Sequence, residues 1–299
     1  GEFTASYDAR PRIASDGDRI FYMSNWGLNI IHKTIGRDIY MAPEIGYRGY
    51  DISEDGSRVV WMNQNQLVLD SVSEAGFTRL MRNNVGFTYD ALTASPSGSM
   101  VICGDRLYST LTGLMMANYA VPDSEYRGAF SPDGRLWGFI KGADKAMITM
   151  RTGDPRALLY NMMLTDPYSA YKMFYHPDGN RVACVDAANG VQMYDMTTYD
   201  PVGLYRFAGN SDACLSKDGT MMLISGDNTV RLHDVRTGRI LRYFFPQHSG
   251  LTSVRVRSVQ FAKDDTMIMI AWSHNYIELY ERSRPVTLEI SPAQRTLGK

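Results

Sequence analysis

Cysteine and histidine are scarce in this sequence. Only 3 of its 299 residues are cysteines, at positions 103, 184 and 214. An odd number at such wide spacing argues against a disulfide framework. We interpret these cysteines as small buried residues of strands, which is typical of a reducing compartment. Because the sequence also contains no Asn-x-Ser/Thr sequon, we expect an intracellular protein of the cytoplasm or nucleus.

Long apolar runs and a strong net charge are also missing. No apolar run approaches the roughly 18 residues that a transmembrane helix needs, so we expect no membrane insertion. The formal net charge is −1, which gives no overall field that favours a polyanion. The segment from Arg231 to Arg257 contains six arginines and only one acidic residue. The strand order expected below places Arg236 and Arg239 on the opposite face from Arg255 and Arg257, so we do not expect nucleic acid to be the main ligand.

Motifs of catalysis and metal binding are absent as well. The sequence has no Gly-x-Ser-x-Gly, no Gly-x-x-x-x-Gly-Lys-Ser/Thr and no His-Glu-x-x-His. The five histidines are spaced unlike metal ligands of one element, and we interpret His176 and His233 as structural. We therefore predict that the protein is not an enzyme and has no catalytic residues, no metal site and no cofactor.

The sequence does contain one turn motif that recurs seven times. In Ser131-Pro132-Asp133-Gly134, Pro presets φ, Asp accepts local hydrogen bonds and Gly tolerates a positive φ. The glycine position of this turn recurs at residues 17, 56, 98, 134, 179, 219 and 265, the last of which is Asp. The mean step is about 41 residues, and such a period carried by short strands is typical of a β-propeller.

The repeat predicts an all-β fold, a seven-bladed β-propeller with four antiparallel strands per blade. The last repeat shows the expected strands most clearly, at residues 254–261, 266–272, 276–280 and 286–290. We expect one propeller domain over residues 1–299. Gly1-Glu2-Phe3 resembles a cloning remnant, so the sequence could be a fragment of a larger chain.

Several segments resemble WD40 repeats. Asp227 to Gly238 is similar to the end of such a repeat, with His233 in the place usually held by Trp, and Met193-Tyr194-Asp195 is a similar variant. His248-Ser249-Gly250 resembles the opening of a repeat. No Trp-Asp or Gly-His dipeptide occurs, so the Asp–His–Ser–Trp hydrogen-bond set of this family cannot be complete. Residues 11–22 are equally similar to TolB-type and prolyl-oligopeptidase-type propeller repeats.

The resemblance implies a binding face formed by the loops between second and third strands and by those between blades. Tyr, Trp and Arg dominate binding hot spots, and several such residues map to these loops. The predicted partner-binding residues are Tyr47, Arg48, Tyr126, Arg127, Tyr168, Tyr171, His248, Arg255, Arg257 and His274.

We expect Arg255 and Arg257 to point to the same side of an extended strand, because side chains two apart share a face. Two such cations could hold an acidic segment of a protein or peptide partner, or they could pair internally with Asp212 or Asp227. The functional hypothesis is a non-enzymatic scaffold for protein–protein interaction that acts as a subunit of a complex. The alternative is the accessory propeller of a prolyl-oligopeptidase-like hydrolase, or a TolB-like extracytoplasmic propeller.

Overall fold

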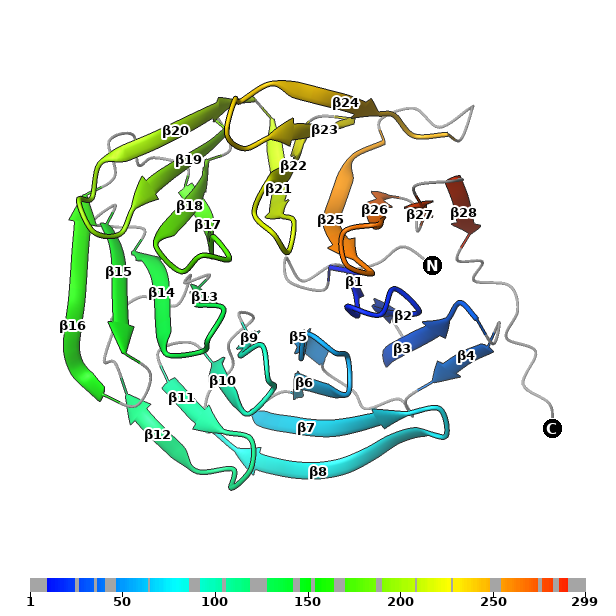
Figure 1. Ribbon diagram of the computed structural model, residues 1–299. Coiled ribbons are helices and arrows are strands. Elements are labelled where there is room, and N and C mark those ends of the chain that lie inside the picture. Colours follow the sequence, from blue (N-terminus) through cyan, green and yellow to red (C-terminus); the bar gives the residue numbers. More distant parts are fainter. Residues whose placement is uncertain are drawn as a thin grey trace.

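The protein is a ring of small antiparallel sheets that resembles a β-propeller (Figure 1). The computed structural model describes residues 10–289 except 25–26, 35–36, 41–46, 64, 86–91, 104–105, 119–127, 142–145, 152–153, 164–169, 187–189, 208, 227, 248–253, 274–275 and 282–284. Within these residues there is no α-helix, and the strands form seven four-stranded sheets. The predicted all-β class and propeller arrangement are confirmed.

Each sheet consists of four consecutive strands. The first contains β1 (Arg12–Ile13), β2 (Arg19–Ser24), β3 (Gly27–His32) and β4 (Arg37–Tyr40). The second contains β5 (Tyr47–Ile52), β6 (Arg58–Asn63), β7 (Gln66–Ser73) and β8 (Gly76–Asn84). The third contains β9 (Leu92–Ala94), β10 (Met100–Cys103), β11 (Arg106–Ser109) and β12 (Met115–Asn118). The fourth contains β13 (Gly128–Phe130), β14 (Leu136–Lys141), β15 (Ala146–Arg151) and β16 (Asp154–Met163).

The other three sheets follow the same order. The fifth contains β17 (Ala170–Tyr175), β18 (Arg181–Asp186), β19 (Gly190–Asp195) and β20 (Pro201–Arg206). The sixth contains β21 (Asn210–Leu215), β22 (Met221–Gly226), β23 (Thr229–Asp234) and β24 (Ile240–Phe244). The seventh contains β25 (Val256–Ala262), β26 (Met267–Trp272), β27 (Tyr276–Glu281) and β28 (Pro285–Glu289). The first strand of each sheet lies at the centre of the ring and the fourth at its circumference (Figure 1).

The core lies between neighbouring sheets. One apolar cluster joins Phe21 of β2 to Tyr50 and Trp61 of the second sheet, and another joins Met193 of β19 to Ile224 of β22. Because second strands pack on both faces, they lose simple alternation, as β6 and β22 do. Fourth strands such as β8 and β24 are mostly exposed.

The repeated turn adopts the expected backbone. Its six glycines have φ between 65° and 74°, and Asp265 takes the same region at 62°. In the turn after β13, the Asp133 carboxylate accepts hydrogen bonds from Ser131 Oγ (2.6 Å) and Arg135 N (3.0 Å). Asp218 and Asp55 repeat this arrangement. The aspartates thus recur because the turn requires them, as the sequence indicated.

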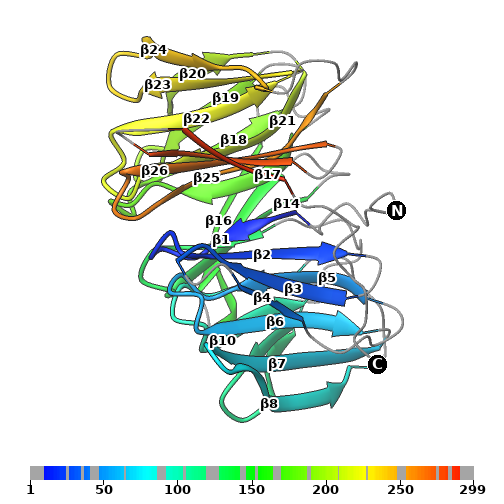
Figure 2. The same cartoon turned by 90° about the vertical axis from the view of Figure 1, so that its right-hand side faces the viewer.

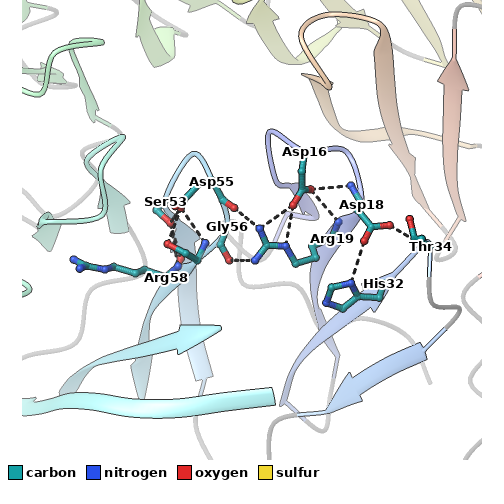
Figure 3. A network of polar contacts seen from close by, with 10 residues as sticks. Asp16, Asp18, Arg19, His32, Thr34, Ser53, Asp55, Gly56 and Arg58 are labelled. Carbon is teal, nitrogen blue, oxygen red and sulfur yellow. Dashed lines mark hydrogen bonds and ion pairs between the residues drawn. The ribbon is translucent and has the colours of Figure 1, made fainter. Parts of the chain in front are cut away.

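All described first hairpin turns gather on one face of the ring, which we call the turn face (Figure 2). Backbone hydrogen bonds link them: Ser15 N donates to Glu54 O (2.9 Å), and Glu54 N donates to Pro96 O (2.9 Å). Arg19 binds Asp16 in its own turn and donates to Gly56 O in the next (3.0 Å; Figure 3). The opposite face, where the first strands begin, is called the loop face.

The ring closes by contact between the first and last sheets. Ile13 N of β1 donates to Gln260 Oε1 of β25 (2.8 Å), and Lys263 N donates to Ser15 O (2.7 Å). Since each described sheet takes its strands from one continuous segment, no strand of one terminus completes the sheet of the other. Closure therefore rests on side-by-side packing, on these hydrogen bonds and on the ion pair between Lys33 and Glu281 of β27.

Buried carboxylates accept the indole N–H groups of two core tryptophans. Asp70 of β7 accepts the indole N–H of Trp61 (2.6 Å) and Arg79 Nε (2.6 Å). In the seventh sheet, Glu278 accepts the indole N–H of Trp272 (2.9 Å) and the hydroxyl of Tyr280 (2.6 Å). Each indole N–H is therefore satisfied inside the core, where an unpaired donor would be costly.

Candidate functional site

A cluster of charged side chains occupies the central strands near the loop face. Asp212 of β21 is fully buried and binds two cations, Lys172 of β17 and Arg10. Lys172 Nζ also donates to Ala213 O (3.0 Å), and Asp212 Oδ2 accepts Val259 N of β25 (3.0 Å). Arg10 precedes the first sheet while Asp212 belongs to the sixth, so this ion pair (3.1 Å) reaches past the seventh sheet. Such a contact places these groups at the centre of the ring.

Nearby cations and hydrogen bonds together have a larger effect than burial on the pKa of Asp212. Burial opposes its ionisation, but Lys172, Arg10 and the Val259 N–H together hold the pKa of Asp212 below its ordinary value. Burial also lowers the pKa of Lys172, and the positive charges of Arg10 and Arg12 act in the same direction, although Asp212 opposes them. The cluster thus favours the charged form of Asp212 but not that of Lys172.

A second pair lies beside it. Arg12 Nε of β1 faces Asp51 Oδ1 of β5 at 3.4 Å, and Asp51 Oδ2 accepts Ala94 N of β9 (2.9 Å). Together the two groups bring three cations, Arg10, Arg12 and Lys172, against two carboxylates. The two groups thus place charged side chains of both signs on the central strands.

Arg255 and Arg257 lie where the loop face meets β25. Both are exposed, whereas Val254 and Val256 are buried. The pairing of β25 with β26 is irregular between Val256 and Ser258, at Arg257, so the common side expected for the two guanidinium groups stays a prediction. Arg255 N donates to Ser273 Oγ (2.9 Å) and Ser273 N donates to Arg255 O (2.6 Å), which fixes the backbone there. Neither arginine forms an ion pair with any described carboxylate.

The internal pairing that the sequence left open is not seen at Asp212. Its carboxylate is occupied by Lys172, Arg10 and Val259 N instead. Asp227, the other acid considered, lies outside the described residues.

The remaining predicted partner-binding residues are only partly described. Tyr47 and Arg48 begin β5, and Tyr171 lies in β17, where the backbone but not the side chain is described. Five more lie outside the described residues: Tyr126, Arg127, Tyr168, His248 and His274. Their role in binding stays a prediction.

Sequence reasoning missed Arg10, Lys172 and Asp212 as a group. Each stands seven residues before the glycine position of its own turn, namely Gly17, Gly179 and Gly219. Because equivalent positions of a repeat share one layer of the ring, this common offset was the signal that could have found them.

The histidines that the sequence marked as structural have such roles. His176 is buried, and its Nε2 lies 3.1 Å from Gly219 O of the next sheet's turn. His233 packs edge-on against Tyr205, and burial lowers its pKa. Among the described residues, no group of three or more His, Cys, Asp or Glu could hold a metal ion, and no helix is long and apolar enough to cross a membrane.

Comparison with protein-family models gives no match for this chain, and a search of curated proteins gives none either.

Proposed function

We propose that this protein is a non-enzymatic interaction scaffold, a seven-bladed WD40-like propeller that binds an acidic protein or peptide segment on its loop face. The observation that carries the proposal is the exposed pair Arg255 and Arg257, which has no described carboxylate partner. Like charges so close repel each other unless an anion offsets them.

The free cysteines support an intracellular location within this proposal. All three are free thiols, and burial raises the pKa of Cys184 and Cys214 to about 12. Thiols of such low acidity react slowly and persist where the compartment is reducing.

Affinity purification followed by mass spectrometry tests the proposal. The bait is the whole chain, compared with the double variant Arg255→Ala, Arg257→Ala. The matched control is Arg236→Ala, Arg239→Ala, which removes the same charge from exposed residues at the β23–β24 turn on the turn face. Proteins captured by the wild type and the control but lost from the loop-face variant, at equal melting temperatures, support the proposal. Capture that is equal for all three baits contradicts it.

The alternative of a hydrolase-associated or TolB-like propeller is motivated by the sequence of residues 11–22. The native full-length chain discriminates it from the scaffold. A downstream Gly-x-Ser-x-Gly with later Asp and His would establish a hydrolase, and a signal peptide would favour the TolB-like class.

A further inference from the structure

We propose that the outer edge of the sixth sheet, at β24, is a second docking surface that binds an extended partner segment carrying one carboxylate among apolar residues. This surface lies on the circumference, away from the loop face, and the proposal is independent of the function proposed above. It rests on Arg231, on two aromatic side chains beside it, and on the unpaired edge of β24.

The position of Arg231 follows from strand register. Arg231 of β23 pairs with Ile224 of β22 and with Tyr243 of β24, so these three side chains share one face of the sheet. Ile224 belongs to the apolar cluster shared with the fifth sheet. That face is therefore the one turned toward β20 and Phe207, which follows it.

The Arg231 guanidinium lies between aromatic rings. Its Cζ is 3.7 Å from the ring centroid of Phe207 and 5.6 Å from that of Tyr243. Tyr243 in turn stacks on Phe245, with ring centroids 6.3 Å apart and planes inclined by 13°. These contacts fix the cation in place through its face and leave its N–H groups in the ring plane to bind an acceptor.

No described residue supplies that acceptor. Arg231 Nε is buried without a hydrogen-bond partner, and no ion pair joins Arg231 to a described carboxylate. A buried guanidinium N–H without an acceptor is costly. A carboxylate that binds the terminal Nη groups of Arg231 would offset its unpaired charge, which is why we specify an acidic partner.

The neighbouring strand edge is open and apolar. β24 ends its sheet and pairs only with β23 among the described strands, and Figures 1 and 2 place it on the circumference beside β20. Leu241, Tyr243 and Phe245 are 52%, 48% and 54% exposed. An exposed strand edge of this kind can accept another strand through main-chain hydrogen bonds, while side-chain contacts select the partner.

Charge decides which occupant fits. A second copy of this chain pairing through its own β24 would bring a second Arg231, together with Arg242, toward the first. Two such sets of cations repel each other, whereas a segment with a carboxylate between apolar residues satisfies both the cation and the apolar edge.

A pair of synthetic peptides tests the proposal by fluorescence anisotropy with the whole chain. The first is Thr-Val-Glu-Val-Tyr-Val-Thr-amide with a dye on its N-terminal amine, and the second replaces Glu with Gln. The protein variants are Arg231→Met, which keeps the apolar stem, and Arg231→Lys, which keeps the charge but loses the planar fork. The matched control is Arg242→Met, because Arg242 lies over Phe244 and Tyr280 on the other face of β24.

We expect the Glu peptide to bind the wild type about tenfold more tightly than the Gln peptide, which corresponds to one charge-assisted hydrogen bond. Arg231→Met should abolish this preference, Arg231→Lys should reduce it, and Arg242→Met should leave it within about twofold of the wild type. Bound peptide should also slow hydrogen exchange of residues 240–245. If Arg231→Met fails to fold, Arg231→Lys decides the question.

Three outcomes overturn the proposal. The first is that the wild type binds neither peptide, or binds both equally. The second is that the preference survives both Arg231 variants. The third is that the chain forms dimers in sedimentation that the peptide does not disrupt and that β24 variants abolish, which would make a second copy the occupant.

Discussion

At the scale of single residues, the backbone of the repeated turn decides which amino acid each position accepts. Gly134 and Gly219 have nearly the same φ, 69° and 72°, but their surroundings differ. A Cβ at residue 134 would meet only Met100 Cε at 3.8 Å, whereas at residue 219 it would lie 2.3 Å from the ring of His176. Backbone strain and steric overlap can therefore be separated in one protein.

We predict that Gly134→Ala lowers the free energy of unfolding by about 1–2 kcal/mol, the cost of a left-handed backbone for a residue with Cβ. Gly219→Ala should cost about 1–3 kcal/mol more, because the ring of His176 must also move. Urea denaturation of both variants measures the difference. Gly179→Ala is the control, since nothing lies within 4 Å of its Cβ. Equal losses for all three variants would show that His176 yields freely.

The turn aspartates predict how stability depends on pH. Hydrogen bonds from Ser131 and the Arg135 N–H lower the pKa of Asp133, and hydrogen bonds from the Thr220 N–H and Ser216 lower that of Asp218. Because the folded-state pKa lies below the unfolded value of 3.8, this stabilisation is present above about pH 4 and is lost as the pH falls further. The melting temperature should fall between pH 5 and pH 3.

The control for that prediction is the double variant Asp133→Asn, Asp218→Asn. An amide oxygen can still accept hydrogen bonds but does not titrate in this range. Its melting temperature should fall less between pH 5 and pH 3 than that of the wild type. A loss of the same size in both proteins would assign the acid sensitivity to other groups.

The buried Asp212 gives a larger expected effect. Asp212→Ala leaves Lys172 and Arg10 near each other without their anion, and breaking one side of a buried pair costs about 3–5 kcal/mol. Urea denaturation should show this loss. Lys172→Met combined with Asp212→Leu removes both buried charges and should recover part of it. Stability unchanged in Asp212→Ala would place the carboxylate in water rather than inside the ring.

At the scale of elements, each sheet grades from a buried second strand to an exposed fourth strand. β22 is almost wholly buried and paired on both sides, while β24 is mostly exposed and paired on one side. Since hydrogen exchange follows local opening, we predict that amides of β6 and β22 exchange slowest and that those of β8 and β24 exchange fastest. Hydrogen exchange with mass spectrometry checks this order. Uniform exchange within one sheet would mean that each sheet opens as a unit.

The sequence predicted individual strands better than it predicted contacts between sheets. The predicted strand 266–272 is observed as β26, Met267–Trp272, and 276–280 as β27, Tyr276–Glu281. Turn chemistry and apolar runs are local, so they can be recognised without the fold. The Arg231 site could not be predicted this way, because Phe207 meets Arg231 only when the fifth and sixth sheets pack together.

At the scale of the whole molecule, closing the ring brings distant residues together. Arg10 and Asp212 are about two hundred positions apart in the sequence, and no local pattern predicts that they pair. The sequence predicted that Arg255 and Arg257 point to one side of a regular strand, but the pairing of β25 is irregular between Val256 and Ser258, and local patterns do not indicate such a bulge. Whether the two arginines bind a partner depends on the loop face as a whole.

Isothermal titration calorimetry tests whether the loop face binds the partner. It measures the affinity of the shortest binding fragment of the captured partner at 50 and 200 mM salt. We predict that Arg255→Ala, Arg257→Ala weakens binding at least tenfold at low salt, with an unchanged melting temperature. Its affinity should also depend less on salt, whereas Arg236→Ala, Arg239→Ala should match the wild type. Equal affinity of the two double variants, or a fall in melting temperature without a fall in affinity, would contradict a binding role for the loop face.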